Sequence, residues 1–224
     1  MRPVALSVIL GCVLLSSCQP MSTGESMDTE DSASAIEPVE PPSSAIQLFN
    51  GQNLDGWEIV NDGQFSVENG TIKVDRGTGW LRSNETFDDF VLTMEFRFLE
   101  EGANSGIFVR TAPASTDDDN GWPVNGYQVQ CRDAVEDGTL LAHMIAVGEV
   151  SFEAESDIDA LRQAYKPAGE WHTYEIRAEG ENLSVTLNGV LITTVTGIAD
   201  LAGHIGIQGE GGLLEFRRVD VQEI

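Results

Sequence analysis

The sequence of 224 residues predicts an all-β domain, a sandwich or jelly roll in which two antiparallel sheets pack face to face. Two observations favour this class. The dipeptides Asn69-Gly70 and Asn188-Gly189 each separate two runs of alternating apolar and polar residues. Asn-Gly at such a position favours a two-residue hairpin turn, because both of its residues need a positive φ. Short alternating runs also recur along the chain from residue 65 onward, as in sandwich folds.

The first residues have the composition of a targeting segment. Arg2 provides a positive start and residues 4–15 an apolar core, which is too short to span a membrane as a helix. Residues 15–18, Leu-Ser-Ser-Cys, resemble a bacterial lipobox, which implies a lipoprotein signal peptide at 1–17 and acylation of Cys18. The alternative is an ordinary cleaved signal in which Cys18 occurs by chance. Gln19 after the cysteine implies sorting to the outer membrane, so we expect a lipid-anchored protein of the cell envelope.

Residues 18–45 form an acidic, Ser- and Pro-rich stretch that is predicted to be a disordered tether. Such a composition cannot bury enough apolar surface to offset the entropy lost on ordering. The globular domain is then expected at 46–224. A formal charge of −25 argues against a nucleic-acid partner, because binding phosphates requires clustered Lys and Arg. The lipid anchor is the one membrane contact that we expect.

The domain is predicted to contain many strands and one helix. Ser156 and Asp159 have the spacing of a capping box, so a short helix is expected near 156–165. Alternation and turn residues predict strands, in chain order, at 65–67, 71–74, 90–99, 104–110, 126–133, 171–178, 183–187, 190–195, 203–208 and 213–221.

The strands 104–110 and 126–133 flank a polar loop, and each has one apolar face. Because successive side chains of a strand point to opposite faces, the apolar members are expected in the core. Those are Ile107, Val109 and Val129, together with Phe96 of the strand 90–99. The opposite faces carry Gly106 and Phe108 and the long hydrogen-bonding side chains of Arg110, Gln128, Gln130 and Arg132.

Several polar side chains would share one exposed face if the strand 90–99 were a neighbour of these two strands. They are Glu95, Arg97, Arg110, Gln128, Gln130 and Arg132. Arg and amide groups match pairs of sugar hydroxyls, and the ring of Trp122 or Phe108 could stack on a pyranose. An antiparallel sheet can also leave one face to solvent, and Trp122 can simply pack within its loop. The pattern therefore predicts either a carbohydrate-binding face or a solvated one.

Seven stretches of the domain resemble the 3-keto-disaccharide hydrolase domain, in that family's order. They are Leu48–Trp57, Asp89–Arg97, Asn104–Arg110, Gly126–Gln130, Lys166–Trp171, Leu187–Gly189 and Gly203–Gln208. The resemblance implies a concanavalin-A-like jelly roll, related to laminarinase-type glycosidases and to laminin-G-like binding domains. Some positions depart from the family's usual residues: Gln128 replaces Glu, His172 replaces Asn, Gly209-Glu210 replaces His, and Arg218 replaces Asn. An amide does not ionise, so Gln128 cannot act as a base.

The family's activity implies an elimination followed by hydration. A ketone at carbon 3 of the sugar acidifies the proton on carbon 2, a base removes that proton, the enolate expels the aglycone from carbon 1, and water then adds. The route needs a positioned base and a group that stabilises the enolate oxygen. The resemblance makes Arg110 the candidate for the oxygen. Trp122, Gln128 and Gln130 are the candidates for binding the sugar.

Glu95, Asp133 and His143 are the candidate bases or metal ligands, and each also has a structural interpretation. Glu95 could pair with a neighbouring arginine, His143 could be a satisfied strand histidine, and Asp133 could end its strand. The metal is unknown. A divalent cation such as calcium is one candidate cofactor, because Asp117, Asp119 and Gly121 resemble part of a calcium loop, although the bidentate Glu of an EF-hand is missing. An acidic solvated turn is the alternative.

Two functions follow, and carbohydrate is the expected partner in both. The first is a hydrolase of 3-keto-glycosides or related glycosides, which Arg110, Gln130 and Asp133 favour. The second is a non-catalytic glycan-binding lipoprotein on the same scaffold, which Gln128 favours.

Overall fold

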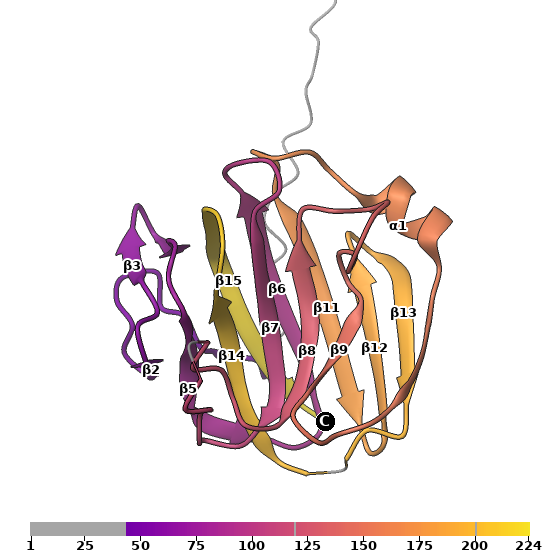
Figure 1. The fold of residues 1–224 in the computed structure, drawn as a ribbon, viewed down its shortest axis with the longest axis horizontal. Helices are drawn as coiled ribbons and strands as arrows, with labels where there is room; N and C mark the ends of the chain where they lie inside the picture. Colours follow the sequence, from indigo (N-terminus) through magenta and orange to yellow (C-terminus); the bar gives the residue numbers. More distant parts are fainter. Residues whose placement is uncertain (1–43, 119, 200) are drawn as a thin grey trace, which may run out of the picture. The chain divides into compact units, whose positions relative to one another are not determined.

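Two antiparallel sheets, as predicted, pack face to face in the computed structural model (Figure 1). The structure describes residues 44–118, 120–199 and 201–224, which all belong to one unit, Glu40–Ile224. The predicted signal peptide at 1–17, Cys18 and all but the last two residues of the tether 18–45 lie outside the described residues.

The larger sheet has nine strands in the described part of the chain. Its order is β10 (Glu153–Ser156), β13 (Val190–Thr196), β12 (Asn182–Leu187), β11 (His172–Glu179), β6 (Phe90–Phe98), β15 (Leu214–Glu223), β4 (Thr71–Val74) and β3 (Phe65–Glu68), and β1 (Ile46–Gln47) also pairs with β15. The smaller sheet has six described strands. Its order is β2 (Trp57–Val60), β5 (Gly79–Phe87), β14 (Gly203–Gly209), β7 (Asn104–Thr111), β8 (Gly126–Arg132) and β9 (Met144–Val147).

Both Asn-Gly dipeptides form the predicted hairpin turns. Asn69 and Gly70 have φ values of 52° and 80° between β3 and β4, and Asn188 and Gly189 have 51° and 82° between β12 and β13. Positive φ at both central residues matches the right-handed twist of the flanking strands. These turns therefore set the registers of two hairpins of the larger sheet.

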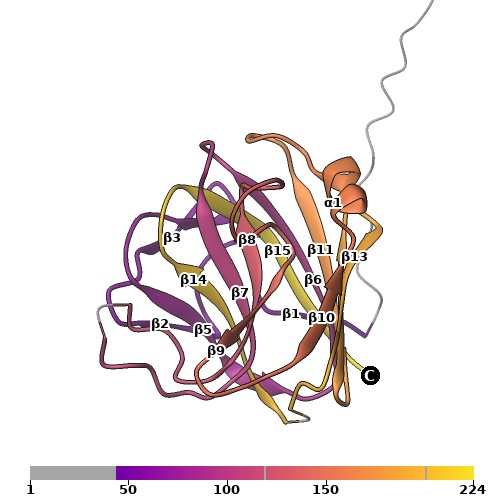
Figure 2. The same ribbon diagram turned by 45° about the vertical axis from the view of Figure 1, so that its right-hand side comes forward.

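One helix, α1 (Ile158–Ala164), lies within the predicted range and packs against β13 (Figure 2). Its N-cap is Asp157, whose carboxylate accepts a hydrogen bond from the Ala160 N–H at 2.9 Å. The Ser156 hydroxyl instead lies 2.7 Å from the Thr193 hydroxyl, so the predicted capping box is wrong by one residue. Within the residues that the structure describes, no helix has the length and hydrophobicity needed to cross a bilayer.

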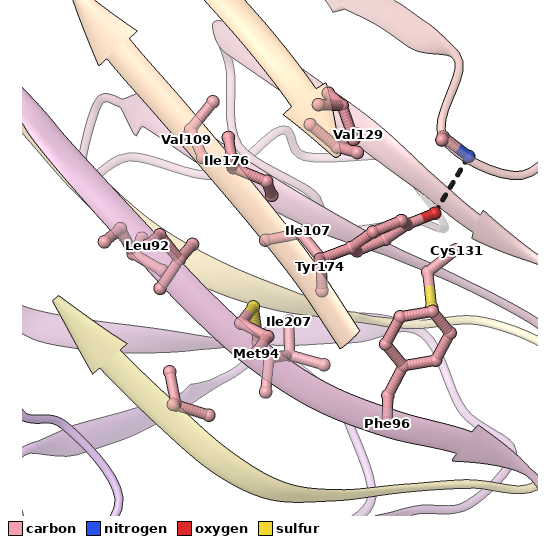
Figure 3. Packing of buried hydrophobic residues seen from close by; sticks show 14 of the residues in the cluster. Leu92, Met94, Phe96, Ile107, Val109, Val129, Cys131, Tyr174, Ile176 and Ile207 are labelled. Atoms are coloured by element: carbon pink, nitrogen blue, oxygen red, sulfur yellow. Dashed lines mark hydrogen bonds between the residues drawn. The ribbon is translucent and has the colours of Figure 1, made fainter. Parts of the chain in front are cut away.

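The core fills the space between the two sheets (Figure 3). Leu92, Met94 and Phe96 of β6 and Tyr174 and Ile176 of β11 are packed with side chains from β7, β8 and β14: Ile107, Val109, Val129, Cys131 and Ile207. The predicted burial of Phe96, Ile107, Val109 and Val129 is confirmed, because each is 0% exposed. Burying a side chain of this size stabilises a fold by roughly 1.5–3 kcal/mol.

One polar contact joins the sheets within this core. The Tyr174 hydroxyl of β11 donates to the carbonyl oxygen of Gln130 in β8 at 2.7 Å. It also accepts from the Ala142 N–H at 2.8 Å, the bond that is dashed in Figure 3. A buried hydroxyl needs such partners, since leaving it unpaired would cost free energy. The contact therefore fixes the backbone of Gln130 against the opposite sheet.

Arg110 does not lie on the exposed face that the alternation predicted. Phe108 pairs with Gly206 and Thr111 with His204, so β7 contains one residue more than β14 between these pairs. Arg110 lies at this bulge with a φ of 50°, and its side chain is 1% exposed. A bulge interrupts the alternation of a strand, which is why the prediction is wrong.

The buried guanidinium of Arg110 connects loops that follow strands of both sheets. It donates to the carbonyl oxygens of Gly180 at 2.6 Å, Ala199 at 2.8 Å and Asp88 at 2.9 and 3.1 Å. It also forms an ion pair with the Asp89 carboxylate at 2.9 Å. The turns β5–β6 and β11–β12 and the segment before β14 are thereby held at one end of the sandwich.

We expect Arg110→Ala to lower the free energy of unfolding by about 3–5 kcal/mol, because it leaves several backbone carbonyls without their buried donor. Urea denaturation followed by circular dichroism measures the change. Arg162→Ala is the control, since Arg162 forms an exposed pair with Asp159 on α1 and such pairs contribute at most about 1 kcal/mol. Equal midpoints for Arg110→Ala and the unsubstituted protein would contradict a structural role for Arg110.

Candidate functional site

The outer face of the six-stranded sheet carries aromatic and amide side chains that water does not reach. Ile107, Val129 and Ile207 belong to the core, so their sequence neighbours in the same strands point outward. Trp80 and Phe108 are 0% exposed although they lie outside the core cluster, and their rings pack edge to face with centroids 5.7 Å apart. Something other than the sandwich core must therefore cover this face.

The cover is the loop 112–125, which runs past β2 and β5 (Figure 2). The Trp80 indole N–H donates to the Ser115 hydroxyl at 3.0 Å, and the Asn61 amide donates to the Gly121 carbonyl. Trp122 is half-buried and its indole N–H lies 3.4 Å from the Gly209 carbonyl oxygen at the end of β14. The loop thus forms a wall over one part of the sheet.

Three glutamines form a buried cluster on this face, which we call the amide floor: Gln128, Gln130 and Gln208. The Gln128 Nε2 donates to Gln130 Oε1 at 3.0 Å and to Gln208 Oε1 at 3.2 Å. Each of the three is at most 4% exposed. Among the described residues, no hydrogen bond reaches Gln128 Oε1 or the Nε2 atoms of Gln130 and Gln208, so one acceptor and two amide donors of the floor are unused within the protein.

Two glycines make room for the large side chains of this face. A Cβ atom at Gly106 would overlap the Gln128 amide, and one at Gly206 would overlap the Trp80 ring. Neither glycine has a positive φ, so space rather than backbone conformation requires them. Gln128 and Trp80 can therefore lie flat across the neighbouring strands.

A pocket of about 220 Å³ opens between the loop, the strand β9 and Gln128, the member of the amide floor that lines it. Gln128 is at its base, Trp122 and Pro123 come from the loop, and Ile145 comes from β9. Pockets for drug-sized ligands measure about 300–1,000 Å³. The volume thus suits a single ring with polar substituents better than an extended chain.

Glu210 extends this face beyond the end of β14 and was not among the site residues predicted from the sequence. The Asn104 side-chain amide of β7 donates to its Oε2 at 2.6 Å. Partial burial raises the pKa of the Glu210 carboxyl, and the nearby Arg132 guanidinium opposes that shift. Its position two residues after Gln208 was the signal available in the sequence, since alternate residues share a face.

His143 also lies on this face. Alternation along β9 places it on the side of Ile145, which lines the pocket, and its backbone carbonyl accepts from the Gln130 N–H at 2.8 Å. Its Nε2 is buried without a hydrogen-bond partner among the described residues. Burial lowers the pKa of His143, so its imidazole is neutral near pH 7.

Trp122, Gln128, Gln130 and His143 are therefore brought together, whereas Glu95 is not. Glu95 belongs to β6 in the other sheet, on that sheet's outer face, where its carboxylate pairs with Arg217 and Arg218. The prediction that Glu95 and Arg97 share a face with Gln128 is wrong because β6 is not a neighbour of β7 or β8. Of the six side chains predicted to share a face, Gln128, Gln130 and Arg132 do so.

Asp133 lies just beyond β8, and its carboxylate is used by the surrounding loops. One oxygen accepts from the Tyr165 hydroxyl at 2.6 Å and the other from the Gly102 N–H at 2.9 Å. Burial and the hydrogen bond to Asp133 raise the pKa of Tyr165. The observed contacts of Asp133 are thus those of a residue that ties two loops together.

The predicted calcium loop is organised as a turn in its described part. The Asp118 Oδ1 accepts from the Thr116 hydroxyl at 2.7 Å and from the N–H groups of Asn120 and Gly121 at 3.0 and 3.1 Å. The Thr116 hydroxyl and these N–H groups lower the pKa of Asp118. Across residues 44–118, 120–199 and 201–224, no three His, Cys, Asp or Glu side chains form a group suited to a metal ion.

The two-sheet jelly roll, with its polar outer face, has the architecture of glycosyl hydrolase-like domains. Residues 44–222 match the 3-keto-alpha-glucoside-1,2-lyase-like domain, and the chain belongs to this family. The resemblance noted in the sequence is thereby confirmed. A search of curated proteins found no match.

Solved structures with the same fold include enzymes and binding domains. A candidate glycosyl hydrolase of Parabacteroides distasonis is 21% identical with a TM-score of 0.60, and the match covers 80% of this chain and 99% of that one. The Emp47p carbohydrate recognition domain is 17% identical with a TM-score of 0.55, covering 80% and 95%. The Bacillus licheniformis beta-glucanase is 14% identical with a TM-score of 0.52, covering 82% and 100%. Identities this low show the fold alone.

We expect Gly106→Ala to displace Gln128 and to lower the free energy of unfolding by about 1–3 kcal/mol, because the added methyl group would overlap the buried amide. Urea denaturation measures the loss, and the side-chain amide signals of Gln128 in NMR spectra report the displacement. Gly211→Ala is the matched control, since a Cβ there meets no atom within 4 Å. An unshifted Gln128 amide in Gly106→Ala would contradict the packing described here.

Proposed function

We propose that the domain binds a carbohydrate between the amide floor and Trp122 and that it cleaves 3-keto-glycosides. The observation that carries this proposal is the amide floor, whose member Gln128 lines a pocket together with Trp122. Amide groups match sugar hydroxyls, and an aromatic ring packs on the apolar face of a pyranose. The family and the carbohydrate recognition domain among the similar structures support a sugar as the ligand.

The family's name supports elimination as the mode of cleavage. A ketone at carbon 3 makes the proton on carbon 2 acidic, and its removal leads to loss of the aglycone from carbon 1. Negative charge then develops on the ketone oxygen, which needs a hydrogen-bond donor. Arg110 is unavailable because its guanidinium is bound to loop carbonyls. The buried, unpartnered Nε2 of the neutral His143 is the better candidate for this donor.

A non-catalytic glycan-binding domain is the second candidate function. It is favoured by the floor itself, because three amides can hold a sugar but cannot ionise to move a proton. The two candidates share the same pocket and differ in whether a bond of the ligand is broken.

The full-length protein is expected to release 4-nitrophenol from 4-nitrophenyl 3-keto-α-glucoside and not from 4-nitrophenyl α-glucoside. The physical reason is that only the ketone acidifies the proton on carbon 2. Absorbance of the released phenol, with and without EDTA, measures cleavage and any need for a divalent cation. Calorimetric binding of both glucosides without release would favour the binding domain, and absence of both binding and release would contradict the proposal.

Trp122→Ala provides the site control for this experiment. Losing the aromatic wall should weaken binding by the roughly 0.5–1.5 kcal/mol that ring contacts contribute beyond area burial. Trp171→Ala is the matched variant, because Trp171 packs against the nine-stranded sheet. The guanidinium carbons of Arg97 and Arg217 lie over its ring, at 4.8 Å and 4.3 Å from the ring centroid. Binding should be unchanged in Trp171→Ala.

We also propose that Cys18 is acylated and holds the protein at the outer membrane, a proposal supported by the lipobox-like residues 15–18. Cys18→Ser is expected to leave the domain folded and to release it from the membrane fraction, because each buried methylene of an acyl chain contributes roughly 0.8 kcal/mol. Sedimentation followed by immunoblotting measures the release. A Cys18→Ser protein that still sediments with membranes in high salt would contradict the lipid anchor.

A further inference from the structure

Glu210 occupies a distinct place at the edge of the proposed site. It is half-buried, it follows the strand residue Gln208 of the amide floor by two positions, and it is adjacent to Gly209, whose carbonyl lies 3.4 Å from the Trp122 indole N–H. Trp122 therefore contacts the end of β14 next to this carboxylate, which lies just outside the residues that line the pocket.

A reaction that begins with proton removal needs an ionisable group within reach of the ligand. The amide floor supplies none, and Trp80, Phe108 and Gly106 supply none either. His143 is an imidazole whose neutral form suits it to donate a hydrogen bond. A carboxylate is the remaining type of base to be found among the described residues around the pocket.

Two carboxylates lie near Trp122, and their surroundings differ. Asp118 lines the pocket, whereas Glu210 lies outside its lining, next to Gly209, whose carbonyl the Trp122 indole contacts. Asp118 accepts three hydrogen bonds from its own loop, which lower its pKa and weaken it as a base. Glu210 accepts one hydrogen bond, from Asn104, and its burial raises its pKa, which strengthens it as a base. When the surroundings of two carboxyl groups shift their pKa values in opposite directions, the group with the raised pKa is the candidate for proton transfer.

We propose that Glu210 is the catalytic base of this site and that Asn104 is its positioning residue, an inference that rests on the proposed cleavage of 3-keto-glycosides. The Glu210 carboxylate takes the proton from carbon 2 of the sugar. The electron pair of that carbon–hydrogen bond first forms the enolate, with its charge on the ketone oxygen. When the ketone re-forms, the pair becomes the double bond between carbons 1 and 2, and the bond from carbon 1 to the glycosidic oxygen breaks. That oxygen leaves with the bonding pair and takes the proton back from Glu210, which yields the aglycone alcohol and an unsaturated 3-keto sugar.

Asn104 holds the carboxylate in place for this step. The Asn104 Nδ2 donates to Glu210 Oε2 at 2.6 Å, while the backbone N–H groups of Asn104 and Gly211 each donate to the other residue's carbonyl at 2.5 and 3.2 Å. A donor to the carboxylate stabilises its charged form and so lowers the pKa of Glu210. The Arg132 charge acts in the same direction.

The test compares Glu210→Gln with the unsubstituted full-length protein on 4-nitrophenyl 3-keto-α-glucoside. The amide keeps the shape of the side chain and the hydrogen bond from Asn104, but it cannot accept a proton at neutral pH. We expect kcat to fall by about 10²–10⁴-fold, the usual contribution of general base catalysis. Binding of 4-nitrophenyl α-glucoside, measured by calorimetry, should stay the same.

Glu215→Gln is the matched control. Glu215 lies on β15 in the other sheet, its side chain is 13% exposed, and it pairs with Arg97 at 2.7 Å. Its replacement should leave kcat unchanged. Glu210→Ala adds a second readout, because added formate can enter the space of the lost carboxyl group and should restore part of the turnover.

The role of Asn104 as the positioning residue is tested by measuring the pH profile of kcat in Asn104→Ala. Turnover requires the ionised Glu210, so it rises with pH through the pKa of this group. Removing the hydrogen bond from Asn104 raises that pKa, so the acidic limb should move to higher pH. A limb that stays in place would limit Asn104 to a structural role and overturn its assignment.

The outcomes separate this inference from the proposed function. Full activity of Glu210→Gln beside an active unsubstituted protein would overturn the role of Glu210 and leave the cleavage itself standing. An unsubstituted protein that neither binds nor cleaves either glucoside would overturn the proposed function, and the inference with it. Loss of turnover with retained binding, together with rescue by formate, supports Glu210 as the base.

Discussion

The two faces of the strand β8 carry side chains that need opposite environments, one apolar and one polar. The arrangement of the site therefore depends on the register of β8 with its neighbouring strands. Val129 and Cys131 face a dry core, while Gln128 and Gln130 face outward. A slip by one residue would exchange these faces and bury two amides among apolar side chains, at a cost of several kcal/mol. Pairing with β7 and β9 and the Tyr174 hydroxyl, which binds the Gln130 carbonyl, all act against such a slip. Core packing therefore also positions the amide floor.

The candidate site combines an amide floor carried by strands with an aromatic wall carried by a loop. Gln128, Gln130 and Gln208 come from neighbouring strands and hydrogen-bond to one another, which lowers the cost of burying them. Gly106 and Gly206 leave the space in which these side chains and Trp80 lie flat. Side chains held on strands keep their positions before a ligand binds, so less conformational entropy is lost on binding. The loop 112–125 supplies the aromatic wall.

Local patterns of the sequence were sufficient to predict much of this fold. The Asn-Gly turns, the strand faces of Ile107 and Val129 and the class of sandwich all follow from alternation and turn chemistry. Arg110 could not be placed, because a bulge with positive φ interrupts the alternation. Glu95 was assigned to the wrong face because alternation within a strand does not say which strands become neighbours. Glu210 follows the strand within a Gly-Glu-Gly-Gly segment that reads as a turn, so its spacing of two residues from Gln208 was a weak signal.

The hydrogen bonds of Arg110 have a consequence for the loop 112–125, which begins just after it. Arg110 lies one residue before β7 ends at Thr111, and the loop that follows is closed at its base by a hydrogen bond from the Ala112 N–H to Asn125 at 3.1 Å. The loop thus leaves and rejoins a framework that is already fixed. Lengthening such a loop costs little, since closure entropy grows only slowly with length. A change in the length or sequence of this loop would therefore leave the sheet below it undisturbed.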